Sequence, residues 1–417
     1  MINFGSLFSG VEAASAAWGP LGWRTRWVAE VEPTACAVLA ERVPEAANLG
    51  DVTAVDFADR ARRAGRIDVL IGGSPCQAFS IAGKRGELSD PRGRLTLRYV
   101  ELVDDLDPEI LVWENVPGVL VVGRDNAFGC LLAGLAGEEG GPLQPAGKKW
   151  TDCGVVYGPR RSVAWRRLGA QHFGLASVRD RVIVVASRNP AVDAFDVLAE
   201  CEGEGLDHQA LDAAREAHAA GGDGDRPRQP GFRYRIPRLR TETIVGPVFG
   251  VVDGETVREG LFPTITARAS AGGRMNYVAY QTTDGPVLRK TMVAEEERLL
   301  GFSGQWTEVP MKGVMLSDTA RSKLMGNSMP VPMIRWVGER IERALVAAWE
   351  ASPTNEDFAR LAVYRLARQE EKDEAAAEHD AFETIARETE DPDGWRRLSI
   401  GQSTGAVSQA VAGVEAS

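Results

Sequence analysis

The sequence lacks any run of about 18 uncharged apolar residues, the shortest length typical of a membrane-spanning helix. It also lacks a basic segment followed by an apolar core near its start, because MINFGSLFSG leads at once into a strand-like stretch. These absences argue against a membrane partner and a secretory signal. We therefore expect a cytoplasmic protein.

Paired cysteines are missing as well. The sequence has five cysteines, an odd number, and none of them forms a C-x-x-C pair: Cys36, Cys76, Cys130, Cys153 and Cys201. This pattern argues against a disulfide framework and against a zinc site, and it fits a reducing compartment with no metal. Most of these thiols are expected to be small buried side chains, so any functional cysteine needs a further argument.

Basic residues are fewer than acidic ones, which gives a net charge of −11. A negative net charge opposes binding to nucleic acid. The distribution is uneven, however. From residue 350 onward, fifteen acidic and seven basic residues account for −8, which leaves −3 for the first 349 residues. The segment 226–240 holds six arginines and no acid, interleaved with Phe232 and Tyr234. This segment is either a phosphate-binding, base-stacking surface or a solvated loop.

The first 190 residues alternate between strand-like and helix-like patterns. Short β-branched runs separated by helices predict a doubly wound α/β domain with a mostly parallel sheet covered on both faces. The expected strands are 3–10, 25–31, 67–73, 109–116 and 181–187, and the expected helices are 11–19, 33–43, 95–106 and a helix around 131–137.

This pattern is lost after the first domain, residues 1–188, and returns later. Residues 189–288 are rich in Gly, Pro, Asp and Arg, with short strand-like pieces, and they predict a smaller inserted domain that we call the inserted lobe. Helical periodicity at 293–302 and 330–350 predicts that residues 289–349 return to the first domain. Residues 350–417 predict an acidic tail, partly helical around 354–388 or disordered.

A tight turn of small residues, LFSGVEAAS, follows the first expected strand, and Glu30 and Glu32 end the second. In doubly wound folds such a turn lets the backbone approach a nucleoside, and an acid about 20 residues later binds the ribose hydroxyls. A purely structural strand-to-helix connection is the alternative. The turn lacks G-x-G-x-x-G spacing, which argues against a dinucleotide-dependent oxidoreductase. Asp51 is expected near the same sheet edge, unless it serves a turn or a helix cap.

The segment IDVLIGGSPCQAFS places a thiol at the end of a buried strand. Pro75 fixes the backbone there, and Cys76 can act as a nucleophile if its thiolate is stabilised. The next expected strand, EILVWENV, ends in Glu114, which is otherwise a capping or solvent-facing carboxylate. Because neighbouring parallel strands end close together, a nucleophile and a general acid are predicted at this edge.

Taken in order, these segments resemble the motifs of DNA cytosine-C5 methyltransferases of the bacterial and phage type. LFSG resembles the first S-adenosylmethionine motif, SPCQAFS the nucleophile motif and WENV the glutamate motif. SVRDR resembles the arginine motif and LMGNSMPVP the last, cofactor-side motif, so the resemblance extends to about residue 349. Two departures stand out: Glu12 and Ala13 where glycines are common, and Ser177 where glutamine is usual.

The resemblance implies a role for each matching position. Cys76 is implied as the nucleophile and Glu114 as the acid, with Arg179 and Arg181 orienting the base. Glu30 is implied to hold the ribose hydroxyls of S-adenosylmethionine, and Asp51 with Val52 to contact the adenine. The full implied cofactor set is Phe8, Ser9, Gly10, Val11, Glu30, Val31, Asp51, Val52, Pro75, Leu95, Asn327 and Ser328.

The implied reaction is that of a DNA (cytosine-5-)-methyltransferase acting on a flipped-out cytosine in double-stranded DNA. The polar loop 80–93 resembles the family's mobile loop that closes over the base, and the inserted lobe is implied to read the target sequence. We expect a monomer on DNA. Whether a cognate restriction endonuclease accompanies the enzyme stays open, since a solitary or phage-borne enzyme would share these motifs.

Two other functions remain as alternatives. One branch of the family methylates transfer RNA, but it resembles a compact chain with a small lobe, whereas this inserted lobe spans about a hundred residues. A catalytically idle DNA-binding protein is the second alternative, and the presence of both Cys76 and Glu114 argues against it.

Overall fold

The computed structural model describes most of the chain up to residue 351. The described residues are 1–74, 93–122, 126–175, 177–199, 249–252, 256–259, 264–265, 277–282 and 285–351, together with 357, 361–362 and 364–365. The chain divides into two compact units. One unit comprises Ile2–Thr241 and Gly246–Ser352, and the other comprises Met1, Glu242–Val245 and Pro353–Ser417.

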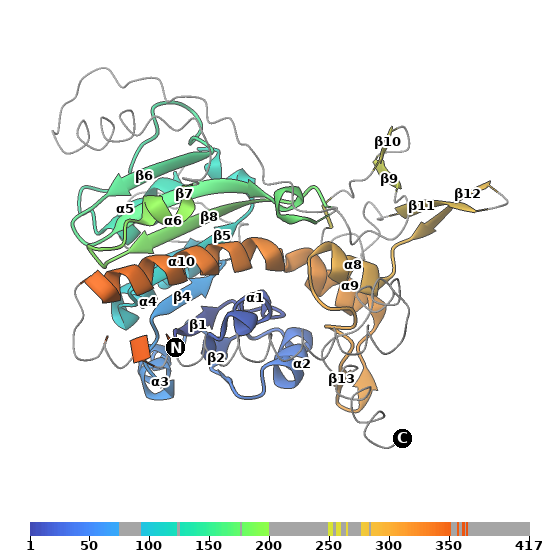
Figure 1. Cartoon of the computed structure of the whole chain (residues 1–417), viewed down its shortest axis with the longest axis horizontal. Coiled ribbons are helices and arrows are strands. Elements are labelled where there is room, and N and C mark those ends of the chain that lie inside the picture. The colour runs from blue at the N-terminus through green and yellow to red at the C-terminus, as the bar shows by residue number, and fades with distance from the viewer. Residues whose placement is uncertain are drawn as a thin grey trace, which may run out of the picture. The chain divides into compact units, whose positions relative to one another are not determined.

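The larger unit is built on an eight-stranded sheet with the order β3-β2-β1-β4-β5-β8-β7-β6 (Figure 1). Strands β3 to β5 pair in parallel, whereas β8, β7 and β6 add antiparallel pairs at one side. The strands are β1 (Asn3–Leu7), β2 (Arg24–Ala29), β3 (Ala47–Asn48), β4 (Val69–Gly72), β5 (Ile110–Asn115), β6 (Cys153–Tyr157), β7 (Ser162–Gly169) and β8 (Asp180–Ser187). The α/β fold class is confirmed, but β6 and β7 were not predicted.

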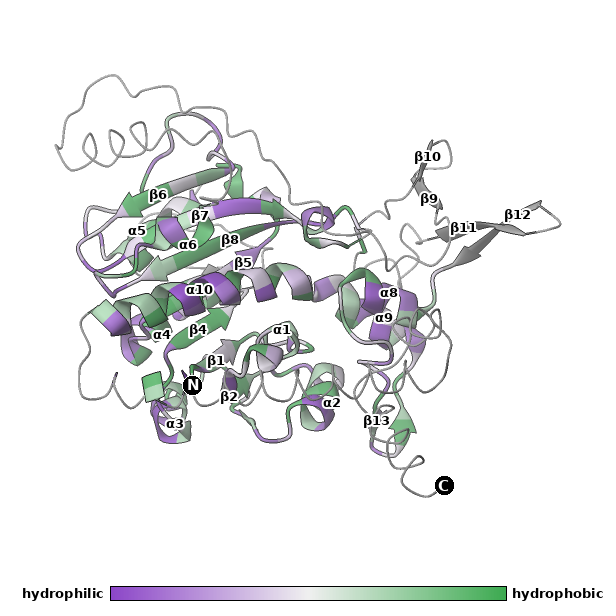
Figure 2. Cartoon of the chain, in the orientation of Figure 1, coloured by the Kyte–Doolittle hydropathy of each residue, from purple (hydrophilic) through white to green (hydrophobic). Residues whose placement is uncertain are grey.

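Two groups of helices cover the sheet. Helix α10 contacts both α1 and α6, and helix α4 contacts both α3 and α5. The helices are α1 (Ala13–Trp18), α2 (Pro33–Arg42), α3 (Phe57–Ala64), α4 (Gly93–Leu106), α5 (Ala127–Ala136), α6 (Ala194–Leu198) and α10 (Val331–Ala351), with short 3-10 turns at Gly19–Leu21, Pro117–Leu120 and Ala170–Phe173. Figure 2 shows β4 mostly apolar and α10 alternating between apolar and polar residues, as expected for a helix with one buried face.

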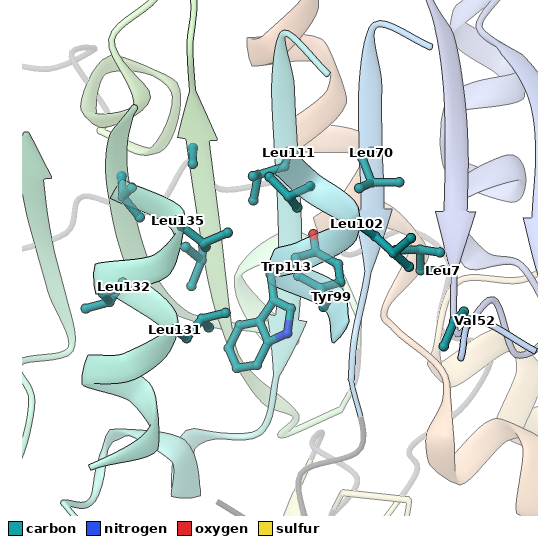
Figure 3. Packing of buried hydrophobic residues seen from close by; sticks show 14 of the residues in the cluster. Leu7, Val52, Leu70, Tyr99, Leu102, Leu111, Trp113, Leu131, Leu132 and Leu135 are labelled. Carbon is teal, nitrogen blue, oxygen red and sulfur yellow. The ribbon is translucent and has the colours of Figure 1, made fainter. Parts of the chain in front are cut away.

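The main hydrophobic core lies between the sheet and α3, α4 and α5 (Figure 3). Leu70, Leu111 and Trp113 point to this side, and the residues that alternate with them along β4 and β5 point to the other. Tyr99 of α4 is fully buried here and donates a hydrogen bond to the Val112 carbonyl, 3.1 Å away. Each such large side chain contributes about 1.5–3 kcal/mol when buried, so this face holds β4 and β5 firmly.

The described part of the span 189–288 includes α6, which packs against β7 and α10, residues 264–265, and most of a four-stranded antiparallel sheet with the order β10-β9-β11-β12. Its strands are β9 (Phe249–Val252), β10 (Thr256–Glu259), β11 (Tyr277–Thr282) and β12 (Gly285–Lys290). After β12 come α8 (Val293–Leu299), the hairpin of β13 (Pro310–Met311) with β14 (Val314–Met315), and α9 (Asp318–Asn327). The domain boundaries drawn from the sequence stay a prediction, and the helix expected around 354–388 falls almost wholly outside the described residues.

Among the helices that the structure describes, none combines the length and the apolar character needed to traverse a bilayer.

Candidate active site

The site lies where the strand order of the parallel part reverses, between β1 and β4. In open α/β sheets, ligands bind beyond the carboxyl ends of the strands at such a switch point. The turn 8–12 follows β1 here, Gly73 and Ser74 follow β4, and Glu114 lies near the end of β5. Segments that are far apart in sequence therefore meet at one edge of the sheet.

The turn after β1 has an unusual backbone. Phe8, Gly10 and Glu12 have φ values of 53°, 56° and 62°, in the left-handed region. Ser9 fastens the turn to β2, because its hydroxyl accepts a hydrogen bond from Ala29 N at 3.0 Å and its own N–H donates to Ala29 O at 3.1 Å. No described atom lies within 4 Å of the point where a Cβ on Gly10 would stand, so the turn leaves room for a ligand.

Glu30 joins this turn to the end of β2. Its Oε2 accepts a hydrogen bond from Gly10 N at 2.9 Å, and its Oε1 accepts from Val31 N at 2.8 Å and Glu32 N at 2.9 Å. Val31 follows and is 64% exposed, which is unusual for valine. An anchored carboxylate beside an exposed apolar side chain fits a ribose with its attached adenine.

Asn48 organises the loop that carries Asp51, although no motif in the sequence marks it as a site residue. Its Oδ1 accepts hydrogen bonds from Glu30 N at 3.1 Å and Gly50 N at 2.9 Å, and its Nδ2 donates to Glu30 O at 3.1 Å. The Asp51 carboxylate accepts from Thr53 N and its hydroxyl, both at 2.8 Å, and these bonds lower the pKa of Asp51. Asn48 thus holds two predicted cofactor segments together.

The remaining predicted cofactor residues come from α4 and α9. Leu95 packs in part against the main core, and Arg98 Nε, one helical turn later, donates to Val52 O at 3.0 Å. Asn327 ends α9 and Ser328 caps it. The anchored Glu30, the exposed Val31 and the open space over Gly10 fit S-adenosylmethionine, but Pro75 of the predicted set lies outside the described residues.

Trp306, in the segment between α8 and α9, supports the turn 8–12, and no motif in the sequence marks it as a site residue. Its indole N–H donates to Val11 O at 2.9 Å. Arg42 of α2 donates to Trp306 O at 2.7 Å and to Gln305 O at 2.6 Å, and its guanidinium lies 5.5 Å from the Trp306 ring centroid. These contacts join the segment after the inserted lobe to the first turn of the chain.

Glu12, which stands where the resembled family has glycine, is buried beneath the turn. Its Oε1 accepts hydrogen bonds from Ser15 N and Oγ, both at 3.2 Å, and so caps α1. Within the described residues its buried Oε2 has no hydrogen-bond partner. Burial raises the pKa of Glu12 to about 7, and the hydrogen bonds from nearby serines offset this only in part.

Gly73, directly after β4, packs closely against Glu114. A Cβ on Gly73 would stand 2.8 Å from Glu114 O and 3.1 Å from its Oε2, so only glycine allows this approach. The Ser74 hydroxyl lies 2.9 Å from the Thr96 hydroxyl and accepts a hydrogen bond from the Trp113 indole at 3.2 Å, while Asn115 Nδ2 donates to Ser74 O at 2.9 Å. The backbone is therefore fixed up to the residue before Pro75; Pro75 and Cys76 lie outside the described residues.

Glu114 forms an ion pair with Arg181, whose Nε lies 2.6 Å from its Oε1. Both side chains are largely buried, with 12% and 9% exposed. The antiparallel register sets Asn115 of β5 opposite Val182 of β8, which brings the two charges together. Burial raises the pKa of Glu114, and the positive charges of Arg181 and Arg179 oppose that rise. The structure thus brings the predicted acid together with one predicted arginine.

Arg179 makes a different set of contacts although it is only two residues away. It is fully buried and donates to three main-chain carbonyls: Ile265 O at 2.7 Å, Gly326 O at 3.0 Å and Ser328 O at 2.5 Å. Burial lowers the pKa of Arg179 to about 9, which still leaves it charged at neutral pH. These hydrogen bonds go to the main chain of residues 265, 326 and 328 and not to Glu114.

Comparison with known proteins agrees with this arrangement. The structure is similar to that of the methyltransferase EhMeth from Entamoeba histolytica, with a TM-score of 0.53 at 16% identity, covering 83% of this chain and 99% of that one. A profile of C-5 cytosine-specific DNA methylases matches residues 2–139. The fold is thus that of a methyltransferase.

Two relatives with at least 31% sequence identity are also methyltransferases by name. The type II methyltransferase M.AquIA from Picosynechococcus is 31% identical over 188 residues, 44% of this chain and 71% of that protein. A protein of Escherichia phage P1 named a DNA N-6-adenine-methyltransferase is 34% identical over 474 residues, 85% of this chain and 63% of its own length. The chain belongs to the C-5 cytosine-specific DNA methylase family, so the family and enzyme class predicted from the sequence are confirmed.

Proposed function

We propose that this chain transfers the methyl group of S-adenosylmethionine to carbon 5 of a cytosine flipped out of a specific duplex DNA sequence, through an adduct between Cys76 and carbon 6. The observation that carries the proposal is the buried Glu114–Arg181 ion pair against Gly73. Gly73 is three residues before Cys76, and Ser74 is fixed by its own hydrogen bonds. Two residues of chain span at most about 7 Å, so chain connectivity limits the distance from Ser74 to Cys76, which supports a role for Cys76 beside Glu114.

Cys76 supplies the electron pair for the reaction. Cytosine carbon 5 is a poor nucleophile, but addition of the Cys76 thiolate to carbon 6 forms a C–S bond and turns carbons 5 and 4 into an enamine. S-adenosylmethionine, when bound, would supply an electrophilic methyl group, whose bond to the sulfonium sulfur breaks so that the neutral thioether S-adenosylhomocysteine leaves. After carbon 5 has gained the methyl group, loss of its proton and departure of the Cys76 thiolate restore the aromatic ring.

Glu114 balances charge during the addition. Negative charge develops on the N3 side of the ring as the thiolate attacks, and a protonated carboxyl group bonded to N3 stabilises it. Burial, which raises the pKa of Glu114, favours this protonated form. Arg181 holds the carboxyl group in place through its 2.6 Å contact and limits the rise of the pKa.

The turn after β1, Glu30 and the α9 terminus would hold S-adenosylmethionine. The Glu30 carboxylate, already oriented by Gly10 N, would accept hydrogen bonds from ribose hydroxyls. Asp51 and Val52 would line the adenine, and Asn327 with Ser328 would close the pocket from the side of α9. The turn after β1 lies at the switch point between β1 and β4, which supports this assignment.

The inserted lobe would read the DNA, and the arginines of 226–240, outside the described residues, would contact phosphates and guanine edges. A base inside a duplex is out of reach of a fixed thiol, so the cytosine must leave the helix. Loop 80–93, most of which is outside the described residues, would close over it.

Mass spectrometry of nucleosides tests the proposal. Unmethylated duplex DNA of mixed sequence, incubated with S-adenosylmethionine and the protein, should gain 5-methylcytosine. Cys76→Ala should abolish transfer while retaining cofactor and DNA binding, whereas Cys153→Ala, which removes a half-buried thiol from β6, should have little effect. Normal turnover by Cys76→Ala would rule out the adduct. Nanopore or bisulfite sequencing of the product would then identify the target site.

The printed name of the phage P1 relative makes N6-methylation of adenine a second candidate. The same digest distinguishes the two, because N6-methyladenine and 5-methylcytosine differ in mass. Amino-group methylation needs no attack on a ring carbon, so a Cys76→Ala variant that still forms N6-methyladenine would favour this candidate. A parallel reaction with transfer RNA tests the third possibility, and preference for RNA would overturn the DNA proposal.

A further inference from the structure

We propose that Arg179 is a positioning residue that fixes Asn327 for S-adenosylmethionine and joins it to the inserted lobe, and that it acts through the main chain and not on the target base. The inference rests on the proposed function, in which Asn327 and Ser328 line the cofactor pocket. It departs from the base-orienting role that the family resemblance implies for Arg179.

The first observation is how Arg179 holds the end of α9. The last carbonyls of a helix have no partner within the helix and carry partial negative charge. Arg179 Nη2 donates to Gly326 O and to Ser328 O, the carbonyls on either side of Asn327. One charged group therefore fixes the peptide units that bracket Asn327. Charge-assisted hydrogen bonds of this kind in a buried site are stronger than neutral ones.

The second observation is that the same guanidinium reaches the inserted lobe. Its Nη1 donates to Ile265 O at 2.7 Å, and Thr264 Oγ1 in turn donates to Val178 O. Residues 264–265 lie 86 positions after 178–179 in sequence, within the span 189–288 assigned to the lobe. These reciprocal bonds tie the lobe segment to the residue that organises the α9 end.

The third observation is the contrast with Arg181. Arg181 pairs with a side chain, Glu114, and its Nη1 donates to the carbonyl of the adjacent residue, Asp180, at 2.7 Å. Arg179 is fully buried, and three of its five N–H donors are used by main-chain carbonyls. The two arginines of one motif thus have different partners. Arg181 positions the Glu114 carboxyl group, whereas Arg179 binds the end of α9 and the lobe segment 264–265.

A titration of S-adenosylmethionine without DNA separates this role from contact with a base. Lysine keeps the charge but cannot reach three separate carbonyls, so Arg179→Lys should weaken the Kd for S-adenosylmethionine about tenfold or more. At saturating S-adenosylmethionine its kcat should stay within a few-fold of wild type. Arg181→Lys is the matched control and should show the reverse, an unchanged Kd with a large fall in kcat.

The outcomes are distinct. If Arg179→Lys binds S-adenosylmethionine like wild type while kcat falls, Arg179 contacts the base and the inference is wrong. If wild type itself does not bind S-adenosylmethionine, the proposed function fails instead. Should Arg179→Lys not fold, Thr264→Val removes only the lobe-side hydroxyl. Its Kd for S-adenosylmethionine should weaken several-fold, and an unchanged Kd would overturn the link.

Discussion

Glu12 shows what a single residue does when it departs from a family pattern. Glycine suits the left-handed backbone at φ 62°, and a buried carboxyl group in its place carries a cost. Part of this cost is offset because Glu12 caps α1 through Ser15. The sequence revealed the departure, but not that the side chain would turn inward and lose contact with water.

The raised pKa of Glu12 leads to a prediction about stability. In the unfolded chain the carboxyl ionises near 4.5, whereas in the folded protein it keeps its proton up to about 7. The folded state therefore binds more protons between these values, and stability falls as pH rises through this window, by about 3 kcal/mol in all. The glutamine in Glu12→Gln does not titrate. The free energy of unfolding of the variant minus that of wild type should therefore increase by about 3 kcal/mol between pH 4.5 and 7.

Urea unfolding of both proteins at several pH values provides the measurement. All other ionisable groups are shared, so the difference between the two curves isolates Glu12. Curves that stay parallel from pH 4.5 to pH 8 would show that the carboxyl ionises as freely in the folded protein as in the unfolded chain.

At the scale of elements, the sequence predicted four strands of the parallel half and β8 of the antiparallel half, but not the short β3 or the strands β6 and β7. β1, β2, β4 and β5 are short apolar runs followed by turn residues or acids, which single out their ends. β7 contains Arg166 and Arg167, and these charges hide its strand character even though Arg166 is buried and bonded to Leu198 O. Partners supplied by α6, far along the chain, cannot be inferred from a local pattern.

The same limit applies to the site. Cys76 and Glu114 are recognisable because they follow strands in motif order. Asn48 and Trp306 are not, since each acts through one or two main-chain contacts to a distant segment. Only the folded chain shows that Trp306 supports the turn at Val11, 295 residues earlier in the sequence.

The close packing of β4 on β5 predicts the effect of one added methyl group. Gly73→Ala would force the Cβ against the main chain of Glu114, which cannot yield as a flexible side-chain end can. We expect a loss of about 1–3 kcal/mol in stability and a fall in kcat of at least tenfold, because the acid moves.

Gly118→Ala is the matched control for this substitution. Its nearest described neighbour to an added Cβ is Val116 Cγ2 at 3.9 Å, an ordinary contact, so stability and kcat should stay close to wild type. Thermal melts and steady-state methyl transfer measure both variants. If Gly73→Ala behaved like the control, the approach of Gly73 to Glu114 would not matter for catalysis.

At the scale of the whole molecule, the change to a strongly acidic sequence near residue 350 nearly coincides with a boundary between the two compact units, at Pro353. Residues from 350 onward carry most of the negative charge, and Pro353–Ser417 belong to a different compact unit from the sheet. A polyanionic segment opposes DNA binding only through long-range repulsion, which salt screens. The net charge of the whole chain is therefore a poor guide to the charge of the site.

Removal of residues 353–417 tests whether this segment contributes to catalysis. We expect the Kd for S-adenosylmethionine and kcat to stay within about twofold of the full chain, and DNA binding to strengthen most at low salt, where repulsion is least screened. Titrations at 50 mM and 300 mM salt make the comparison. An inactive truncated protein would show that the segment completes the enzyme.

The bond from the Trp18 indole to Ile334 O, 2.8 Å long, joins the first helix to the last helix of the sheet unit across 316 residues. During synthesis, at about 5–20 residues per second, Trp18 leaves the ribosome roughly 16 to 63 s before its acceptor. The helix layer that contains α1 cannot close in that interval. The inserted lobe precedes α10 in the chain, so its residues have all been synthesised before α1 and α10 can pack together.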